Sequence, residues 1–436
     1  MTHSDAPADS DRDSHGSPLV SPDAVIEQLA STRDIIVPLA NGEPVSLIDA
    51  IEANADRFDG LRIHQMHALH DRPYLHGAFG DQIRHVSYFL SPTTRPCYAA
   101  RHIDLVPNNF SEMRELLRAR THDPVVLAAA SPIDRHGYFS LGVSADYVAS
   151  FIGRAPFFLE ANRQMPRTFG RNQLHVSQVA GWVEVDRPLI ELAPALSDRT
   201  DAQIAALVAE RIPNGATIQV GIGATPNAIM AALHGHQDLG IHTELLSDGV
   251  IDLIETGVVN GVRKRLNRTK TVGTFALGSA RLHGFLDDNP ALELWPVSYV
   301  NDPRVIATEP NFVSINSTLT VDLLGQCASE TIGGRYYSSS GGQADFARGA
   351  MYSEGGQGFV VLHSTTDHNI SKISPTLSPG DVVTTIKNTV DKVVTEWGVA
   401  ELRGHSIRER ANALIAIAHP DHRDQLRHHA RELGYT

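Results

Sequence analysis

Short apolar segments rich in β-branched residues alternate with amphipathic stretches along most of this sequence. Four segments have the composition of buried strands, at 124–130, 217–220, 270–276 and 358–363. Helical periodicity occupies stretches between them, as at 201–211, 226–233 and 407–417. This alternation predicts βαβ units and a mainly parallel sheet. No repeat of about 20–50 residues is visible, which excludes solenoids and propellers.

The length of 436 residues predicts more than one domain, since a domain usually holds about 100–200 residues. Segment 187–200 contains two prolines and a Ser-Asp-Arg turn, and we place a boundary there. We therefore expect two α/β domains, at 21–195 and 196–436. Residues 1–20 are polar and acidic, without the apolar core of a signal peptide, and are predicted to be a disordered tail.

Composition excludes several functional classes. The net charge of −13 disfavours nucleic acid as the main partner, because phosphate backbones need a basic face. No window of about 18 apolar residues exists, so no membrane span is expected. The two cysteines, Cys97 and Cys327, exclude a disulfide framework and favour the cytoplasm. The 22 histidines form no ligand pattern, so no metal site is expected.

A glycine-rich turn follows the predicted strand at 217–220. The sequence Gly-Ile-Gly-Ala-Thr at 221–225 leads to Pro226, and Thr225 is predicted to be the N-cap of the next helix. Such a turn lets backbone N–H groups approach a phosphate or an oxyanion. A purely structural turn is an equally good interpretation of this motif by itself.

A second predicted strand, at 239–243, ends at Glu244. Open α/β sheets bind ligands at the carboxyl ends of their strands. An ionised carboxylate there can attack an acyl carbonyl without a general base. From spacing alone, a solvent-facing or helix-capping glutamate is the simpler interpretation.

Two further segments carry candidate functional residues. The loop at 338–350 contains the pair Gly341 and Gly342, followed by Asp345 and Arg348, which could pair to fix the turn. The basic run at 263–265 could hold phosphates, although such runs are usually solvated.

These segments together resemble the acetyl-CoA hydrolase/transferase family of class I CoA transferases, and in particular its 4-hydroxybutyrate and butyrate–acetate CoA-transferases. The resemblance extends from about Pro22 to Gly434 and rests on the order and spacing of many short motifs. The matching segments lie at 131–137, 140–143, 162–170, 221–226, 242–244, 301–303, 315–317, 341–350, 394–396 and 402–404.

The resemblance implies two open α/β domains of the CoA-transferase, isomerase-like type, with the active site at their interface. It implies Glu244 as the nucleophile and Asn301 and Gly342 as oxyanion stabilisers. It also implies a CoA-binding set and an acyl pocket. The CoA-binding set is Gly221, Ile222, Gly223, Ala224, Thr225, Gly341 and Gly342, and the acyl pocket is Gln164, Met165, Pro166 and Thr168.

The resemblance further implies acyl-CoA and small carboxylates as substrates and no metal or organic cofactor. We also expect a homo-oligomer, a dimer, in the cytoplasm. Leu245, Lys372, Trp397 and His405 depart from residues common in the family, and these departures bear on the acyl pocket and the preferred CoA donor. Three other functions stay open: an acyl-CoA hydrolase with the same glutamate, a sugar-phosphate isomerase, and a CoA-binding sensor without activity.

Overall fold

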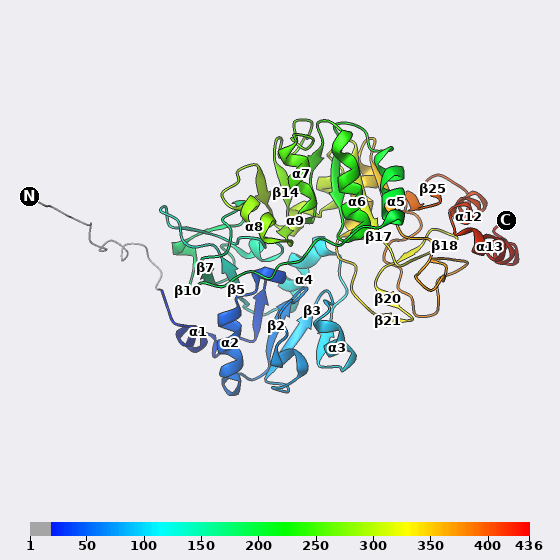
Figure 1. The fold of residues 1–436 in the computed structure, drawn as a ribbon. Helices are drawn as coiled ribbons and strands as arrows, with labels where there is room; N and C mark the ends of the chain where they lie inside the picture. Colours follow the sequence, from blue (N-terminus) through cyan, green and yellow to red (C-terminus); the bar gives the residue numbers. More distant parts are fainter. Residues whose placement is uncertain (1–18) are drawn as a thin grey trace, which may run out of the picture.

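The structure, a computed structural model, describes residues 19–436, so most of the predicted tail lies outside the described residues. The end of that tail is corrected, because Leu19 forms a β-bridge with Trp182 and the Val20 N–H donates to the Trp182 carbonyl at 2.9 Å. The chain forms two α/β parts, blue to cyan and green to red in Figure 1.

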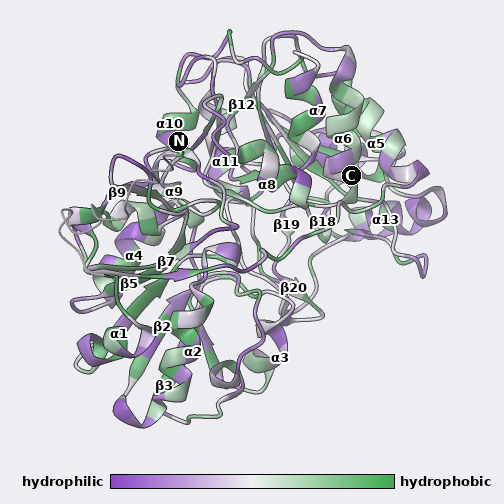
Figure 2. Cartoon of the chain, turned by 60° about the vertical axis from the view of Figure 1, so that its left-hand side comes forward, coloured by the Kyte–Doolittle hydropathy of each residue, from purple (hydrophilic) through white to green (hydrophobic). Residues whose placement is uncertain are grey.

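The N-terminal part is built on a seven-stranded sheet with the order β10-β7-β5-β1-β2-β3-β4, in which all neighbours are parallel. Strands β1, β5 and β7 are buried along their whole length, which explains their continuous apolar sequences. Figure 2 shows hydrophobic, green ribbon in this sheet near the label of β5. The strands are β1 Asp34–Val37, β2 Leu61–Gln65, β3 Ile83–Ser87, β4 Ile103–Leu105, β5 Val125–Ala130, β7 Phe157–Asn162 and β10 Gly181–Val185; the helices are α1 Pro22–Leu29, α2 Val45–Ala53, α3 Thr94–Ala99 and α4 Met113–Arg120.

The C-terminal part is built on a six-stranded sheet with the order β12-β11-β17-β22-β24-β25, parallel except at its β25 edge. Its strands are β11 Thr217–Val220, β12 Gly240–Ile241, β17 Phe312–Ser317, β22 Gln357–Val361, β24 Lys392–Thr395 and β25 Gly398–Glu401. Its helices are α5 Arg199–Ala209, α6 Ala224–Ala232, α7 Gly249–Glu255, α8 Ala280–Leu286, α9 Val297–Val300, α10 Pro303–Ile306, α11 Gln343–Tyr352, α12 Ile407–Ala416 and α13 Pro420–Glu432.

Short strands complete the fold. Two-stranded sheets are formed by β6 Tyr138–Ser140 with β9 Gln173–His175, by β13 Leu245–Leu246 with β15 Phe275–Ala276, and by β20 Thr331–Ile332 with β21 Arg335–Tyr336. In one three-stranded sheet, β16 Leu292–Leu294 lies between β14 Thr271–Gly273 and β8 Phe169–Gly170. In another, β18 Thr320–Asp322 lies between β19 Cys327–Ala328 and β23 Ile373–Ser374.

Hydrogen bonds across the two parts hold them together. Strand β8 of the N-terminal part pairs with β16 of the C-terminal part. The Asp146 N–H donates to the Thr274 carbonyl at 3.0 Å, and the Val297 N–H donates to the Asp146 carbonyl at 2.8 Å. Segment 186–198 connects the two large sheets and contains no helix or strand. The interface is therefore fixed by backbone as well as by side-chain packing.

Two predicted elements differ from the observed ones. The strand expected at 270–276 is broken at Thr274, whose side chain donates to the Trp295 carbonyl, so that β14 and β15 join different sheets. Helix α6 begins at Ala224, with Gly223 as its N-cap, rather than after Thr225. Gly223 has a φ of 133°, a value that favours glycine, and this lets the helix start earlier than Pro226 indicates.

Candidate active site

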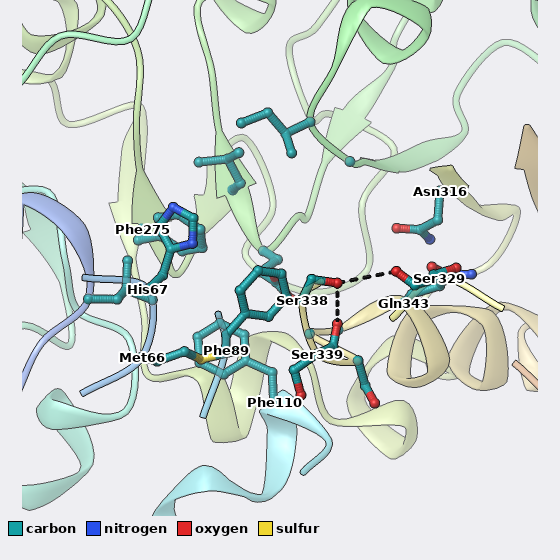
Figure 3. A pocket seen from close by; sticks show the side chains of 18 of the residues that line it. Met66, His67, Phe89, Phe110, Phe275, Asn316, Ser329, Ser338, Ser339 and Gln343 are labelled. Atoms are coloured by element: carbon teal, nitrogen blue, oxygen red, sulfur yellow. Dashed lines mark hydrogen bonds between the residues drawn. The ribbon is translucent and has the colours of Figure 1, made fainter. Parts of the chain in front are cut away.

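A cavity of about 270 Å³ lies between the two parts of the molecule. Figure 3 shows aromatic and apolar side chains on one side, and serine, asparagine and glutamine side chains on the other. The apolar lining residues are Leu39, Met66, Phe89, Phe110, Val220, Ile222, Leu245, Phe275 and Leu277; the others are His67, Gln219, Gly221, Glu244, Asn316, Ser317, Ser329, Ser338, Ser339, Ser340, Gly341, Gly342 and Gln343.

Glu244 lies between β12 and β13, where the chain leaves the large C-terminal sheet. The predicted strand at 239–243 is shorter than expected and ends at Ile241. The Glu244 carbonyl accepts hydrogen bonds from the N–H groups of Thr274 at 3.0 Å and Phe275 at 3.2 Å. The backbone that carries the glutamate is therefore held at the point where β14 and β15 separate.

The Glu244 carboxylate points to a pair of hydrogen-bond donors. Asn301 Nδ2 donates to Glu244 Oε2 at 2.7 Å, and the Gly342 N–H also donates to the carboxylate. Glu244 is partly accessible because it lines the cavity, but protein atoms enclose it, and this burial raises its pKa to about 7. The nearby Asp345 charge also raises this pKa, while the two hydrogen bonds lower it.

The loop that carries Gly341 and Gly342 is pinned to the N-terminal part. The Phe110 N–H donates to the Gly341 carbonyl at 3.1 Å. The Ser111 N–H and Oγ donate to the Asp345 carboxylate at 2.9 and 2.8 Å. Asp345 is buried and therefore bonds Ser111 across the interface, whereas Arg348 is exposed. Both parts of the molecule thus position the donor beside Glu244.

The glycine-rich turn at 221–225 is only partly in the cavity. Gly221 and Ile222 line it, whereas Gly223, Ala224 and Thr225 do not. The Thr225 hydroxyl donates to Asp201 at 2.5 Å, which fixes the start of α6. The backbone N–H of Gly221 donates to the Ile315 carbonyl, so it is engaged within the sheet.

The predicted acyl pocket is not brought to Glu244. Gln164, Met165 and Pro166 line a different cavity with residues of α8, and Thr168 is buried, with its hydroxyl bonded to the Gly142 carbonyl at 2.7 Å. The N-terminal part instead supplies Leu39, Met66, His67, Phe89 and Phe110 to the Glu244 cavity.

These N-terminal residues were missed by the sequence analysis. Leu39, Met66 and Phe89 follow the ends of the neighbouring strands β1, β2 and β3. The rule that ligands bind at the carboxyl ends of parallel strands could have found them. Gln343 was also missed as a site residue: its Nε2 is buried, lines the cavity and has no hydrogen-bond partner among the described residues.

Other candidate residues have structural roles. Lys264 is buried, and its Nζ donates to the carbonyls of Ile241 and Lys270 at 2.9 and 2.8 Å. Asp198, Asp201 and His363 have metal-ligand spacing, but Asp201 is already bonded to Thr225 and, at 2.8 Å, to His363. Of the four departures from the family pattern, Leu245 lines the Glu244 cavity. No helix within residues 19–436 is long and apolar enough to cross a bilayer.

Comparison with known proteins agrees with this geometry. Residues 10–191 match the acetyl-CoA hydrolase/transferase N-terminal domain, and residues 278–430 match the C-terminal domain of the same family. The chain is 44% identical to succinyl-CoA:cyclohexane-1-carboxylate CoA transferase of Geobacter metallireducens, over 91% of each chain. It is 40% identical to 4-hydroxybutyrate coenzyme A transferase of Clostridium kluyveri, over 94% of this chain and 96% of that one.

Solved structures and more distant relatives extend the comparison. The crystal structure of RipA from Yersinia pestis is similar with a TM-score of 0.91 and 36% identity, over 96% of this chain and 98% of that one. The acetyl-CoA hydrolase of Kluyveromyces lactis is 31% identical over 47% of this chain and 38% of its own length. The predicted family resemblance is confirmed. The chain belongs to the acetyl-CoA hydrolase/transferase family and is an enzyme of the CoA-transferase class.

Proposed function

We propose that this enzyme moves CoA from an acyl-CoA to a short-chain carboxylate, of the acetate, butyrate or 4-hydroxybutyrate type, through a thioester between Glu244 and CoA. The observation that carries this proposal is a carboxylate in a largely apolar cavity, held only by neutral donors. Asn301 and the Gly342 N–H bind it, and none of the described residues that line the cavity is a lysine or arginine.

This environment suits a nucleophile. A carboxylate that has lost most of its water and has no cation beside it is a better nucleophile than a solvated one, because less of its charge is neutralised. Its pKa of about 7 leaves a large ionised fraction near neutral pH. No general base is needed, since the ionised group carries no proton to remove.

The reaction follows in balanced steps. The Glu244 carboxylate attacks the thioester carbonyl, the C–S bond breaks, and CoA leaves as the thiolate from a mixed anhydride. The thiolate attacks the Glu244 carbonyl carbon and releases the first carboxylate, which leaves the glutamyl-CoA thioester. An incoming carboxylate then attacks this thioester, and the same two steps run in reverse to give the new acyl-CoA. Two difficult transfers become several easier ones.

The donors beside Glu244 serve these steps in a defined way. Asn301 Nδ2 binds Oε2 of Glu244, and the Gly342 N–H binds the same carboxylate group. When Glu244 is acylated, its carbonyl oxygen occupies the same position, and its charge grows each time a nucleophile adds to that carbon. Donors already in place stabilise such an oxyanion by about 3–4 kcal/mol each.

The division of the cavity supports one orientation of the substrate. The aromatic side, with Phe89, Phe110 and Phe275, suits an aliphatic acyl chain. The polar side, with Asn316 and the unpartnered Gln343 amide, suits the amide-bearing arm of CoA. Ile222, which is 55% exposed, lies where that arm would pass.

A donor–acceptor panel tests the proposal. Purified protein is incubated with acetyl-, butyryl- and 4-hydroxybutyryl-CoA against each carboxylate, and new acyl-CoA is measured by mass. We expect exchange that depends on the acceptor, with one new acyl-CoA formed for each donor acyl-CoA consumed. Without an acceptor, a peptide that contains Glu244 should be modified. Release of free CoA independent of acceptor would establish a hydrolase instead.

We also propose that the enzyme acts as a homodimer in the cytoplasm, without a metal or an organic cofactor. Light scattering of the purified protein measures its oligomeric state. Transferase activity after exhaustive dialysis against EDTA tests for a metal, and a loss of activity restored by an added metal would overturn that part of the proposal.

A further inference from the structure

A second pocket, of about 820 Å³, also lies between the two parts of the molecule. The N-terminal part contributes residues of α3 and β4 and the turn between them, and the C-terminal part contributes the hairpin of β20 and β21. Residues 334–336 of the hairpin line this pocket, and the chain then enters the Glu244 cavity, which residues 338–343 line.

Four arginines line this second pocket, which we call the arginine pocket: Arg84, Arg95, Arg101 and Arg335. Among the described residues that line the pocket, Asp104 is the single acidic one. Its Oδ2 lies 3.0 Å from Arg84 Nε in an ion pair. Arg101 and Arg335 are exposed, and among the described residues neither guanidinium has a hydrogen bond or an ion pair. A local excess of positive charge on a chain of net charge −13 attracts an anion to this place.

The pocket has a fixed frame. Arg95 Nε donates to the Tyr337 carbonyl at 2.5 Å, and its guanidinium lies 3.5 Å from the centre of the Tyr337 ring. Tyr98 and Tyr336 meet edge to face across the two parts, with ring centres 6.1 Å apart. The hairpin turn consists of Gly333 and Gly334, both with positive φ, as a tight two-residue turn requires.

We propose that the arginine pocket binds the polyphosphate group of a nucleotide. Guanidinium groups bind phosphate oxygens in a bidentate way, and Arg101 and Arg335 approach from opposite sides of the interface with free donors. The volume exceeds what a single phosphate needs, and the partly exposed side chains of Tyr98 and Tyr336 offer contact area for a base. The group can come from the nucleotide end of the CoA substrate or from a separate nucleotide.

Calorimetric titration of the full chain with ADP and with pyrophosphate tests this proposal. The variants are Arg101→Ala/Arg335→Ala and, as a matched control, Arg408→Ala, which removes an exposed arginine from α12. Each lost charge-assisted contact is expected to weaken ADP binding roughly tenfold or more. The double variant should therefore lose most of its affinity, and the control should not. Thermal melting confirms that both variants are folded.

Addition of CoA distinguishes the two sources. If CoA displaces ADP and the double variant weakens both, the pocket holds the nucleotide end of the substrate. If CoA and ADP bind together and only ADP binding depends on the two arginines, the pocket is a separate nucleotide site. These titrations measure binding without turnover, so their outcome is independent of the proposed reaction. Absence of ADP binding to the wild type, or equal ADP affinity in the double variant and the control, would overturn the proposal.

Discussion

The Glu244 cavity and the arginine pocket lie at the same domain interface, yet their chemistry is opposite. The first encloses one acid among apolar and neutral polar groups, while the second gathers four arginines at the surface. Burial of the Glu244 carboxylate raises its pKa, whereas charges that stay in water keep their ordinary ionisation and attract anions. Under the two proposals, the interface separates the group that reacts from the groups that bind the nucleotide.

Removal of the acid is expected to have the largest effect. Glu244→Ala and Glu244→Gln should lose transferase activity by several orders of magnitude, because the variants have no carboxylate to carry the acyl and CoA groups. Initial rates of exchange measure this loss. Glu184→Gln, which removes an exposed carboxylate from β10, is the matched control and should keep wild-type turnover. Wild-type turnover in Glu244→Ala would end the proposed mechanism.

A methyl group at position 342 should have the next largest effect. A Cβ there would overlap both the Glu244 carboxylate and the Asn301 amide. Gly342→Ala should therefore lower turnover by roughly 100-fold or more, as for the loss of an oxyanion donor. Gly284→Ala is the control, since a Cβ at Gly284 meets no atom within 4 Å. A fall in melting temperature without a fall in turnover per folded molecule would assign Gly342 a structural role only.

The two sides of the Glu244 cavity differ in how well the sequence predicts them. The family resemblance implies Glu244, Asn301 and Gly342, and the alternation of apolar segments predicts the mainly parallel sheets, because both kinds of signal are local in the chain. The N-terminal wall of the cavity has no local motif. Leu39, Met66 and Phe89 each follow a different strand, so only the rule on the carboxyl ends of parallel strands, applied to β1, β2 and β3 together, could have brought them to the site.

Tertiary contacts also explain where the structure differs from what local spacing indicates. Thr274 breaks a continuous apolar run because its side chain bonds Trp295, a partner 21 residues away. Segment 164–168 matches a family motif, yet it packs beside α8 rather than beside Glu244. Asp345 has a close sequence neighbour of opposite charge in Arg348 but bonds Ser111 instead. Local spacing contains none of these partners.

The pH dependence of kcat/KM should report the ionisation of Glu244, and variants of its neighbours should shift that dependence along the pH axis. Glu244 must be ionised to attack, so kcat/KM for acyl-CoA should fall about tenfold per unit below a pH of about 7. Asp345→Asn removes a nearby negative charge, so the fall in kcat/KM, the acid limb of the profile, should move to lower pH. Asn301→Ala removes a donor to the ionised carboxylate and should move the acid limb to higher pH. Identical pH profiles in all three proteins would show that another group controls the limb.

Stability should show the smallest effect and the same contrast between the two regions. The pKa of Glu244 is higher in the folded protein than its ordinary value of 4.5, so the folded state binds more protons between pH 4.5 and about 7. The contribution of Glu244 to stability is therefore complete below pH 4.5 and is lost as the pH rises through about 7, by at most about 3 kcal/mol.

Glu244→Gln has no ionised carboxylate to bury at high pH. Its melting temperature should therefore exceed that of the wild type by a few degrees at pH 8 and by less at pH 5. Arg101→Ala/Arg335→Ala changes only exposed charges and should melt like the wild type at both pH values. An equal difference at pH 5 and pH 8 for Glu244→Gln would mean that the carboxylate is solvated, and the contrast between the two regions would then disappear.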